Sequence, residues 1–226
     1  NVLTNVINEA GGYPTHNFQT GQFEGAAKIS GESQAALENE RGGEGSATHG
    51  CHRGCIIRCS GTFYGKNGNF LTKQPEYETV WSFGAHCGNT DVAAIIEAEH
   101  LCDAYGLDGI SVGNVVGFLM DCYHQGLLTS ADTGGLDLSW GNGEAMVEAV
   151  KLIGERKGPG LEWSKGVRYL EQSIDGADGL GAQVKGLELP AYDPRASKGM
   201  ALAYATSDRG GCHLRSWPIG DELLAT

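Results

Sequence analysis

Apolar residues recur at helical spacing along most of this chain of 226 residues. Side chains three or four positions apart lie on one face of a helix, so this periodicity predicts helices that each bury one stripe of residues. We predict helices over residues 2–10, 32–38, 90–105, 114–125, 143–157, 161–173 and 197–206. Gly11-Gly12 and Gly158-Pro159 stand at two of the predicted C-terminal ends, where glycine and proline stop helices.

Segments with a strand pattern are few and short. Residues 62–64 and 70–72 flank a Gly-Lys-Asn-Gly sequence, which is typical of a β-hairpin. Residues 184–189 alternate and end at Pro190, which predicts one further strand. The predicted fold class is therefore mainly α, multihelical, with a small β-hairpin element.

Composition and charge disfavour two classes of partner, membranes and nucleic acids. No apolar run approaches the roughly 18 residues that a membrane-spanning helix needs. The formal net charge is −12, whereas phosphate recognition needs a basic surface. The chain begins Asn-Val-Leu, without a methionine or a basic leader. We therefore expect it to be part of a longer polypeptide.

Three of the seven cysteines, Cys51, Cys55 and Cys59, fall in one short segment. An iron–sulfur cluster requires several thiolates that converge on one small body, and a single loop can supply them. One alternative is a zinc site with His49 or His52 as the fourth ligand. Another is three buried thiols without a metal. The crowded, odd-numbered cysteines favour a metal site in a reducing compartment, such as the cytoplasm, over a secreted disulfide framework.

Five motifs follow one another along the chain. They are the cysteine loop at 51–59, Pro-Glu-Tyr-Glu-Thr-Val-Trp at 75–81, Asp-Ala-Tyr-Gly-Leu-Asp at 103–108, Leu-Glu-Leu-Pro-Ala-Tyr-Asp-Pro-Arg at 187–195 and Arg-Gly-Gly-Cys-His at 209–213. In this order and spacing they resemble the aldehyde:ferredoxin oxidoreductase family, whose members use tungsten or molybdenum held by two pterins. Full-length members are more than twice as long as this chain. The resemblance assigns residues 1–182 to the family's second domain and residues 183–226 to the truncated start of its third.

The resemblance implies an enzyme that oxidises aldehydes to carboxylic acids at a tungsten- or molybdenum-bis(pterin) centre. Electrons would pass through a 4Fe–4S cluster to ferredoxin or another iron–sulfur carrier. It implies a cytoplasmic protein with no nucleic-acid or membrane partner, and it is compatible with a homodimer. We expect the fragment alone to be inactive, because part of the cofactor site and the fourth cluster cysteine would lie outside it. The choice of metal and of aldehyde does not follow from the sequence.

The same resemblance assigns roles to individual residues. The cluster ligands would be Cys51, Cys55 and Cys59, although three residues separate the first two where many members have two. The pterin would be bound by Asp103, Gly106, Leu107, Asp108 and Arg215. Glu78 and His213 would face the substrate, where a carboxylate can take a proton and an imidazole can polarise a carbonyl.

Two other functions remain open on the sequence alone. One is an iron–sulfur electron-transfer module that performs no oxidation, and the other is a structural zinc-binding domain. Ordinary structural roles also exist for the site residues. Glu78 could be a solvated residue at a hairpin edge, and His213 a loop imidazole bonded to backbone. Asp103 and Asp108 could be solvated carboxylates around a helix C-cap.

Overall fold

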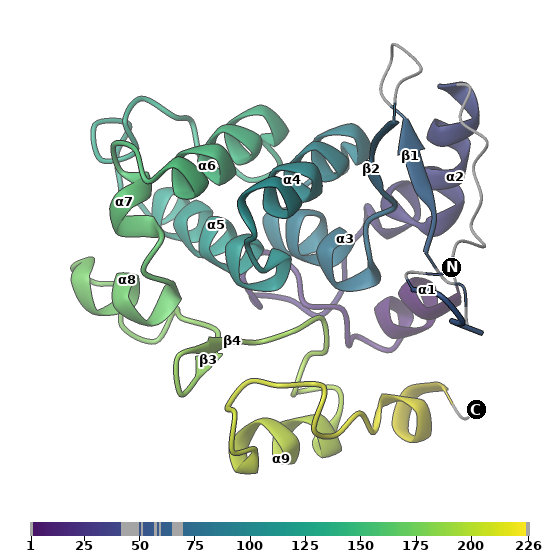
Figure 1. Ribbon diagram of the computed structural model, residues 1–226. Helices are drawn as coiled ribbons and strands as arrows, with labels where there is room; N and C mark the ends of the chain where they lie inside the picture. The colour runs from purple at the N-terminus through teal and green to yellow at the C-terminus, as the bar shows by residue number, and fades with distance from the viewer. Residues whose placement is uncertain are drawn as a thin grey trace.

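The computed structural model describes residues 2–41, 50, 52–56, 58, 60–64 and 70–224. Within these ranges the chain is mainly helical with two small antiparallel sheets, which confirms the predicted fold class (Figure 1). The α-helices are α1 (Val2–Glu9), α2 (Gly31–Glu40), α3 (Tyr77–Phe83), α4 (Val92–Tyr105), α5 (Gly109–His124), α6 (Gly143–Glu155), α7 (Gly160–Trp163), α8 (Val167–Ser173) and α9 (Lys198–Thr206). The short elements are η1 (Ala26–Ile29), η2 (Ala85–Cys87), η3 (Gly220–Leu224), β1 (Thr62–Tyr64), β2 (Phe70–Lys73), β3 (Gln183–Val184) and β4 (Leu187–Glu188). None of the described helices is long and apolar enough to cross a membrane.

Helix α5 is the centre of the core. Every residue from Val112 to Cys122 is buried, and a helix that is apolar on nearly all sides has to be covered on all sides. Helices α3, α6 and α8 pack against it, and α4 lies beside α6 (Figure 1). The buried carboxylate of Asp121 accepts hydrogen bonds from the amides of Asn17 and Gln19. Helix α5 therefore fixes the relative positions of several surrounding elements.

Glycines at every fourth position of α5 let α3 and η2 approach its backbone. A Cβ atom on Gly113 would lie 2.9 Å from the main-chain carbonyl carbon of Ser82, and one on Gly117 would overlap the His86 ring. The Ser82 hydroxyl donates a hydrogen bond to the Gly109 carbonyl oxygen at 2.9 Å. Helices α3 and α5 therefore meet nearly backbone to backbone. We call Gly109, Gly113 and Gly117 the glycine ridge.

Replacing Gly113 by alanine is expected to destabilise the protein by about 1–3 kcal/mol, because overpacking a close contact forces backbone shifts. The gain in helix propensity of about 1 kcal/mol would offset only part of this cost. The measurement is the midpoint of thermal unfolding. Gly109→Ala is the matched comparison, since its nearest neighbour would be the Thr79 hydroxyl at 3.0 Å and a side chain can move. Equal midpoints for wild type and Gly113→Ala would contradict the close packing.

Several predicted elements are confirmed, and the main differences have identifiable causes. No helix is predicted over residues 77–83, yet α3 forms there. Helix α5 begins at Gly109 rather than at 114, because the Asp108 carboxylate accepts the Ser111 N–H at 2.8 Å and caps the helix. The single helix predicted over 161–173 is wrong. It is divided into α7 and α8 by Gly166, whose φ of 87° does not continue a helix.

The single strand predicted over 184–189 is also wrong. The segment is a hairpin in which Val184 pairs with Leu187, and Lys185 and Gly186 form the turn with φ values of 58° and 84°. Positive φ at both central residues is the geometry of a tight two-residue hairpin turn. By contrast, the hairpin predicted from residues 62–64 and 70–72 is confirmed as β1 and β2.

Residues 183–224 run along one side of the helical body, from the β3–β4 hairpin through α9 to η3 (Figure 1). The Asp193 N–H donates a hydrogen bond to the Gly12 carbonyl oxygen at 3.0 Å and joins this segment to the N-terminal region. The domain boundary predicted between residues 182 and 183 coincides with the start of β3. That the two parts are separate domains stays a prediction.

Candidate functional site

Glu78 lies in the first turn of α3 and is largely buried, with 14% of its side chain exposed. The Ala191 N–H donates a hydrogen bond to Glu78 Oε2 at 2.9 Å. Glu78 Oε1 is buried and has no hydrogen-bond partner among the described residues. The alternative of a solvated residue at a hairpin edge is therefore wrong, because α3 carries this carboxyl into the interior.

Burial raises the pKa of Glu78 from the ordinary 4.5 to about 7, because a low-dielectric interior disfavours the charged form. The hydrogen bond from Ala191 and the nearby Tyr192 hydroxyl lower the pKa in part, and the Asp108 carboxylate raises it further. The Glu78 carboxyl is therefore poised to gain or lose a proton near neutral pH, as catalytic carboxyl groups often are.

His213 is placed by a glycine-dependent loop. A Cβ atom on Gly211 would lie 2.7 Å from the Leu187 carbonyl oxygen, and one on Gly210 would overlap the Val184 carbonyl. Gly210 also has a φ of 95°, which favours glycine. The loop can therefore lie flat along the β3–β4 hairpin.

In this position His213 Nε2 is 3.9 Å from Glu78 Oε1, close but beyond hydrogen-bond distance. Burial lowers the pKa of His213; the Asp108 carboxylate raises it, and the Arg209 guanidinium lowers it. The net effect is a lowered pKa, so His213 is a neutral imidazole at neutral pH. A neutral imidazole can both donate and accept a hydrogen bond.

The motif at 103–108 forms the turn between α4 and α5. Gly106 has the left-handed conformation, with a φ of 68°, and ends α4, and the Leu107 N–H donates to the Cys102 carbonyl oxygen at 2.8 Å. Leu107 packs against the hydrophobic core. Asp108 then caps α5 through one carboxylate oxygen, Oδ1. The turn is thus an αL C-cap followed directly by an N-cap, which presents Asp108 between the two helices.

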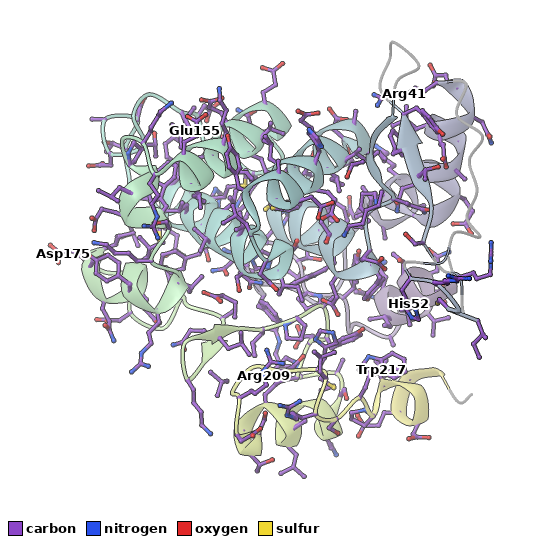
Figure 2. The ribbon with its side chains drawn as sticks, in the orientation of Figure 1. Arg41, His52, Glu155, Asp175, Arg209 and Trp217 are labelled. Atoms are coloured by element: carbon purple, nitrogen blue, oxygen red, sulfur yellow. The ribbon has the colours of Figure 1, made fainter. Side chains whose placement is uncertain are left out.

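A cleft of about 80 Å³ opens beside this turn and is lined by Asp108, Arg209 and His213, among others. A second cavity of about 360 Å³ shares Asp108 and Ser111 with the first. Figure 2 shows Arg209 in the C-terminal segment below the helical body, between the hairpin and α9. The structure therefore brings together Asp108 and His213, with Glu78 3.9 Å behind the imidazole.

Asp103, by contrast, is engaged with β2. Its Oδ2 accepts the Thr72 hydroxyl at 3.3 Å, and its Oδ1 lies 3.5 Å from Lys73 Nζ. Lys73 also pairs at 2.8 Å with the Glu99 carboxylate, which is only 4% exposed. Asp103 is thus part of an ion cluster that ties the β1–β2 hairpin to the last turns of α4. About half of its side chain remains accessible.

Arg215 does not line either of these two cavities. Its Nε lies 3.5 Å from Asp208 Oδ1, and both side chains are mostly exposed. The arginine that lines the cleft is Arg209, which belongs to the Arg-Gly-Gly-Cys-His motif but was not among the predicted site residues. Its place in that motif is the signal that could have identified it.

Glu188 is a second residue that sequence reasoning missed. It is buried, and its two oxygens accept the Val167 N–H at 3.0 Å and the Ser111 hydroxyl at 2.8 Å. It therefore joins the N-terminal ends of α5 and α8 beside the cleft. A glutamate between two leucines in an alternating segment predicts an exposed side chain. The sequence pattern therefore gave no sign that Glu188 is buried.

Of the predicted cluster ligands, Cys51 and Cys59 lie outside the described residues. Cys55 is half-buried in the loop 52–56, where its N–H donates to the His52 carbonyl oxygen at 3.2 Å. The described residues include no group of three or more His, Cys, Asp or Glu side chains arranged to hold a metal ion. Because two of the three cysteines are outside that search, the cluster assignment stays a prediction.

Comparison with known proteins decides the family. Residues 1–225 match the sequence model described as "Aldehyde ferredoxin oxidoreductase, domains 2 & 3". The chain belongs to the aldehyde ferredoxin oxidoreductase family. It is 41% identical over 224 residues to the tungsten-containing aldehyde ferredoxin oxidoreductases of Thermococcus kodakarensis and Pyrococcus furiosus. The family predicted from the five motifs is thereby confirmed.

These alignments cover 99% of this chain but 36% of each relative, so the chain spans about a third of their length. A more distant relative is the aliphatic sulfonate oxidoreductase, WOR-like subunit, of Pyrococcus furiosus. It is 30% identical over 174 residues, which are 74% of this chain and 28% of that protein. The relatives are thus matched at two levels of similarity, 41% and 30% identity.

The fold has a counterpart among solved structures. The active-site complex BamBC of benzoyl coenzyme A reductase, solved with 1,5-dienoyl-CoA, superposes with a TM-score of 0.63 at 21% identity. The match covers 80% of this chain and 27% of that one. At this identity the likeness shows the shared fold alone, and it supports the helical architecture of this chain.

Proposed function

We propose that the full-length protein oxidises aldehydes to carboxylic acids at a tungsten-pterin or molybdenum-pterin centre. The observation that carries the proposal is the juxtaposition of Asp108 and His213 at one cleft, with the high-pKa carboxyl of Glu78 3.9 Å from the imidazole. Membership of a family whose named relatives contain tungsten favours tungsten over molybdenum. In each turnover, an aldehyde and water would become a carboxylic acid, two protons and two electrons.

The residues at the α4–α5 turn fit a pterin. Asp108 uses Oδ1 for its helix cap, which leaves Oδ2 to accept hydrogen bonds from pterin N–H groups. A Cβ atom on Gly106 would meet no atom within 4 Å, so the turn is open for a flat ring to approach. With Leu107 and the half-exposed Asp103, these residues would form the pterin site, and Arg209 rather than Arg215 is the nearer cation at the cleft.

When bound, the metal centre would supply the two-electron oxidation. The chain's own residues would orient the aldehyde and handle its proton. In the tautomer that carries a proton on Nε2, His213 would donate a hydrogen bond to the aldehyde oxygen and polarise the carbonyl. A proton released in the reaction would be held at Glu78 Oε1, which lies 3.9 Å from the same Nε2. The raised pKa of Glu78 would allow it to accept that proton near neutral pH.

We further propose that Cys51, Cys55 and Cys59 ligate a 4Fe–4S cluster and that ferredoxin, or another iron–sulfur carrier, accepts the electrons. A reducing cytoplasmic compartment would keep these thiols available. Residues 1–182 and 183–226 would correspond to the second domain and the beginning of the third domain of the intact enzyme. A homodimer is compatible with this arrangement.

The deciding experiment is elemental analysis of the full-length protein purified without oxygen, together with electronic and EPR spectra. We expect tungsten or molybdenum, and iron with the EPR signal of a reduced cluster. Cys55→Ser should lower the iron content and the EPR signal. Cys122→Ala is the matched control, because the buried Cys122 thiol lies in α5 and is not a proposed ligand.

Each rival function predicts a different result. Iron without tungsten or molybdenum would contradict aldehyde oxidation and support an electron-transfer module. Zinc alone, which is silent in both spectra, would support the structural alternative. Full iron content in Cys55→Ser would contradict its assignment as a cluster ligand.

A further inference from the structure

Two buried polar atoms close to the candidate site lack hydrogen-bond partners among the described residues. One is Glu78 Oε1 and the other is the Tyr13 hydroxyl, whose residue is 0% exposed. A buried polar group without a partner costs roughly 1–3 kcal/mol, so such groups in folded proteins are nearly always satisfied by protein or by ordered water. One shared hydrogen-bond partner could satisfy both Glu78 Oε1 and the Tyr13 hydroxyl.

Three hydrogen bonds hold the residues around Tyr13 against the residues around Glu78. Next to Tyr13, the Gly12 carbonyl oxygen accepts the Asp193 N–H at 3.0 Å. The same segment, through the Ala191 N–H, binds Glu78 Oε2 at 2.9 Å. On the other side of Tyr13, the Pro14 carbonyl oxygen accepts the indole N–H of Trp81 at 2.7 Å.

Trp81 follows Glu78 by three positions on α3, so the two side chains leave the helix on the same face. Tyr13 therefore belongs to a closed chain of contacts that links residues 12–14, α3 and residues 191–193. The Tyr13 ring packs 6.2 Å from the Tyr77 ring, again on α3. The buried Tyr13 ring is thus packed against the helix turn that carries Glu78.

The electrostatics agree with this placement. Burial raises the pKa of Tyr13, and the Glu78 carboxylate raises it further, so the phenol stays protonated and can act only as a neutral donor or acceptor. Other titratable groups act on Glu78 or are acted on by it from every neighbouring element. They are Tyr77 from α3, Tyr192 from the segment before α9, Tyr204 from α9 and Asp108 from the α4–α5 turn. His213, in the loop after α9, lies 3.9 Å from Glu78 Oε1.

We propose that Tyr13 is a positioning residue for Glu78, its hydroxyl donating a hydrogen bond through one buried water molecule to Glu78 Oε1. A buried water needs two to four polar partners, and the Tyr13 hydroxyl and Glu78 Oε1 supply two. The bridge stabilises the ionised carboxylate and keeps Oε1 turned toward His213. The catalytic role of this bridge rests on the proposed function. The bridge between Tyr13 and Glu78 does not depend on that function.

The test is Tyr13→Phe in the full-length protein, which removes the hydroxyl and keeps the ring. The protonation of Glu78 is followed by infrared spectroscopy, from the carboxylic-acid C=O band that is absent in Glu78→Gln. Loss of a donor to the carboxylate should move the titration midpoint upward by about one pH unit, a tenfold change in the proton equilibrium. The pH at which aldehyde oxidation falls on the acidic side should move by the same amount.

Tyr204→Phe is the matched control. Its hydroxyl is also buried near Glu78 but donates to the Tyr192 carbonyl oxygen at 3.1 Å, so its removal should leave the Glu78 midpoint in place. An unchanged midpoint in Tyr13→Phe, or an equal shift in both variants, would overturn the inference. Because the infrared titration needs no turnover, it decides the matter even if the protein holds no tungsten and the proposed function fails.

Discussion

Replacing His213 by alanine is expected to reduce kcat for aldehyde oxidation by about 10²–10⁴-fold, the range found when a positioned acid–base group is lost. The reason is geometric. His213 lines the cleft with Asp108, and its Nε2 lies 3.9 Å from Glu78 Oε1, so its removal breaks the link between the cleft and the carboxyl. The measurement is kcat and KM with a simple aldehyde, alongside metal and iron contents of the full-length protein.

The metal content distinguishes a chemical role of His213 from a structural one. We expect tungsten and iron to remain at wild-type levels, because the described contacts of His213 lie with Tyr192 and Glu78. Leu202→Ala, on α9 and 65% exposed, is the control and should retain activity, because Leu202 does not line the cleft. Loss of tungsten from His213→Ala would show that the residue holds the cofactor site together and that its proposed role is wrong.

Glu78→Gln should have an effect of similar size on activity and a distinct pH signature. Glutamine fills the same space and can still accept the Ala191 N–H, but it cannot take a proton. We expect kcat to fall by about 10²–10⁴-fold. In the wild type, kcat/KM should decline as the pH falls through about 7, where the carboxyl becomes protonated. A wild-type profile that is flat between pH 5.5 and 8.5 would contradict this role.

Glu78→Gln should increase the stability of the protein above neutral pH, although it lowers activity. Between the ordinary pKa of 4.5 and the folded-state value of about 7, the folded protein binds more protons at Glu78 than the unfolded chain does. Its free energy of unfolding therefore decreases as the pH rises through this window. At pH 8 the cost of the buried charge is on the order of 3 kcal/mol. Glu78→Gln should thus have a higher thermal midpoint than wild type at pH 8 and lose this advantage near pH 4.5.

The long helices could be predicted from the sequence, because each combines an amphipathic or apolar period with a local stop signal. Helix α6, for example, starts at the Asn142 cap and ends before Gly158-Pro159 as expected. Helix α3 could not be predicted in this way. Five of its seven residues are buried, from Thr79 to Phe83, so the segment has no polar face to give it a period. Its helical form depends on packing against the glycine ridge.

For the candidate site, the sequence could identify residues but not their arrangement in space. Motifs could identify Glu78, Asp108 and His213, because the resemblance is carried by short conserved-looking strings of residues. Their geometry could not be predicted, since Glu78 is held by Ala191, which is 113 positions away in the sequence. The same limit applies to Arg209 and Arg215: both lie in or next to one motif, and only the folded loop shows which of them lines the cleft.

The glycine ridge has a consequence for how selectivity can arise. Only the small side chains of Thr79 and Ser82 lie between α3 and α5, so main-chain packing sets the spacing between the helix that carries Glu78 and the turn that carries Asp108. The two groups share the rigidity of the main chain, which is the condition for electrostatic preorganisation. Adaptation to aldehydes of different size would therefore depend on the cleft walls that loops supply, while the spacing between α3 and the α4–α5 turn stays constant.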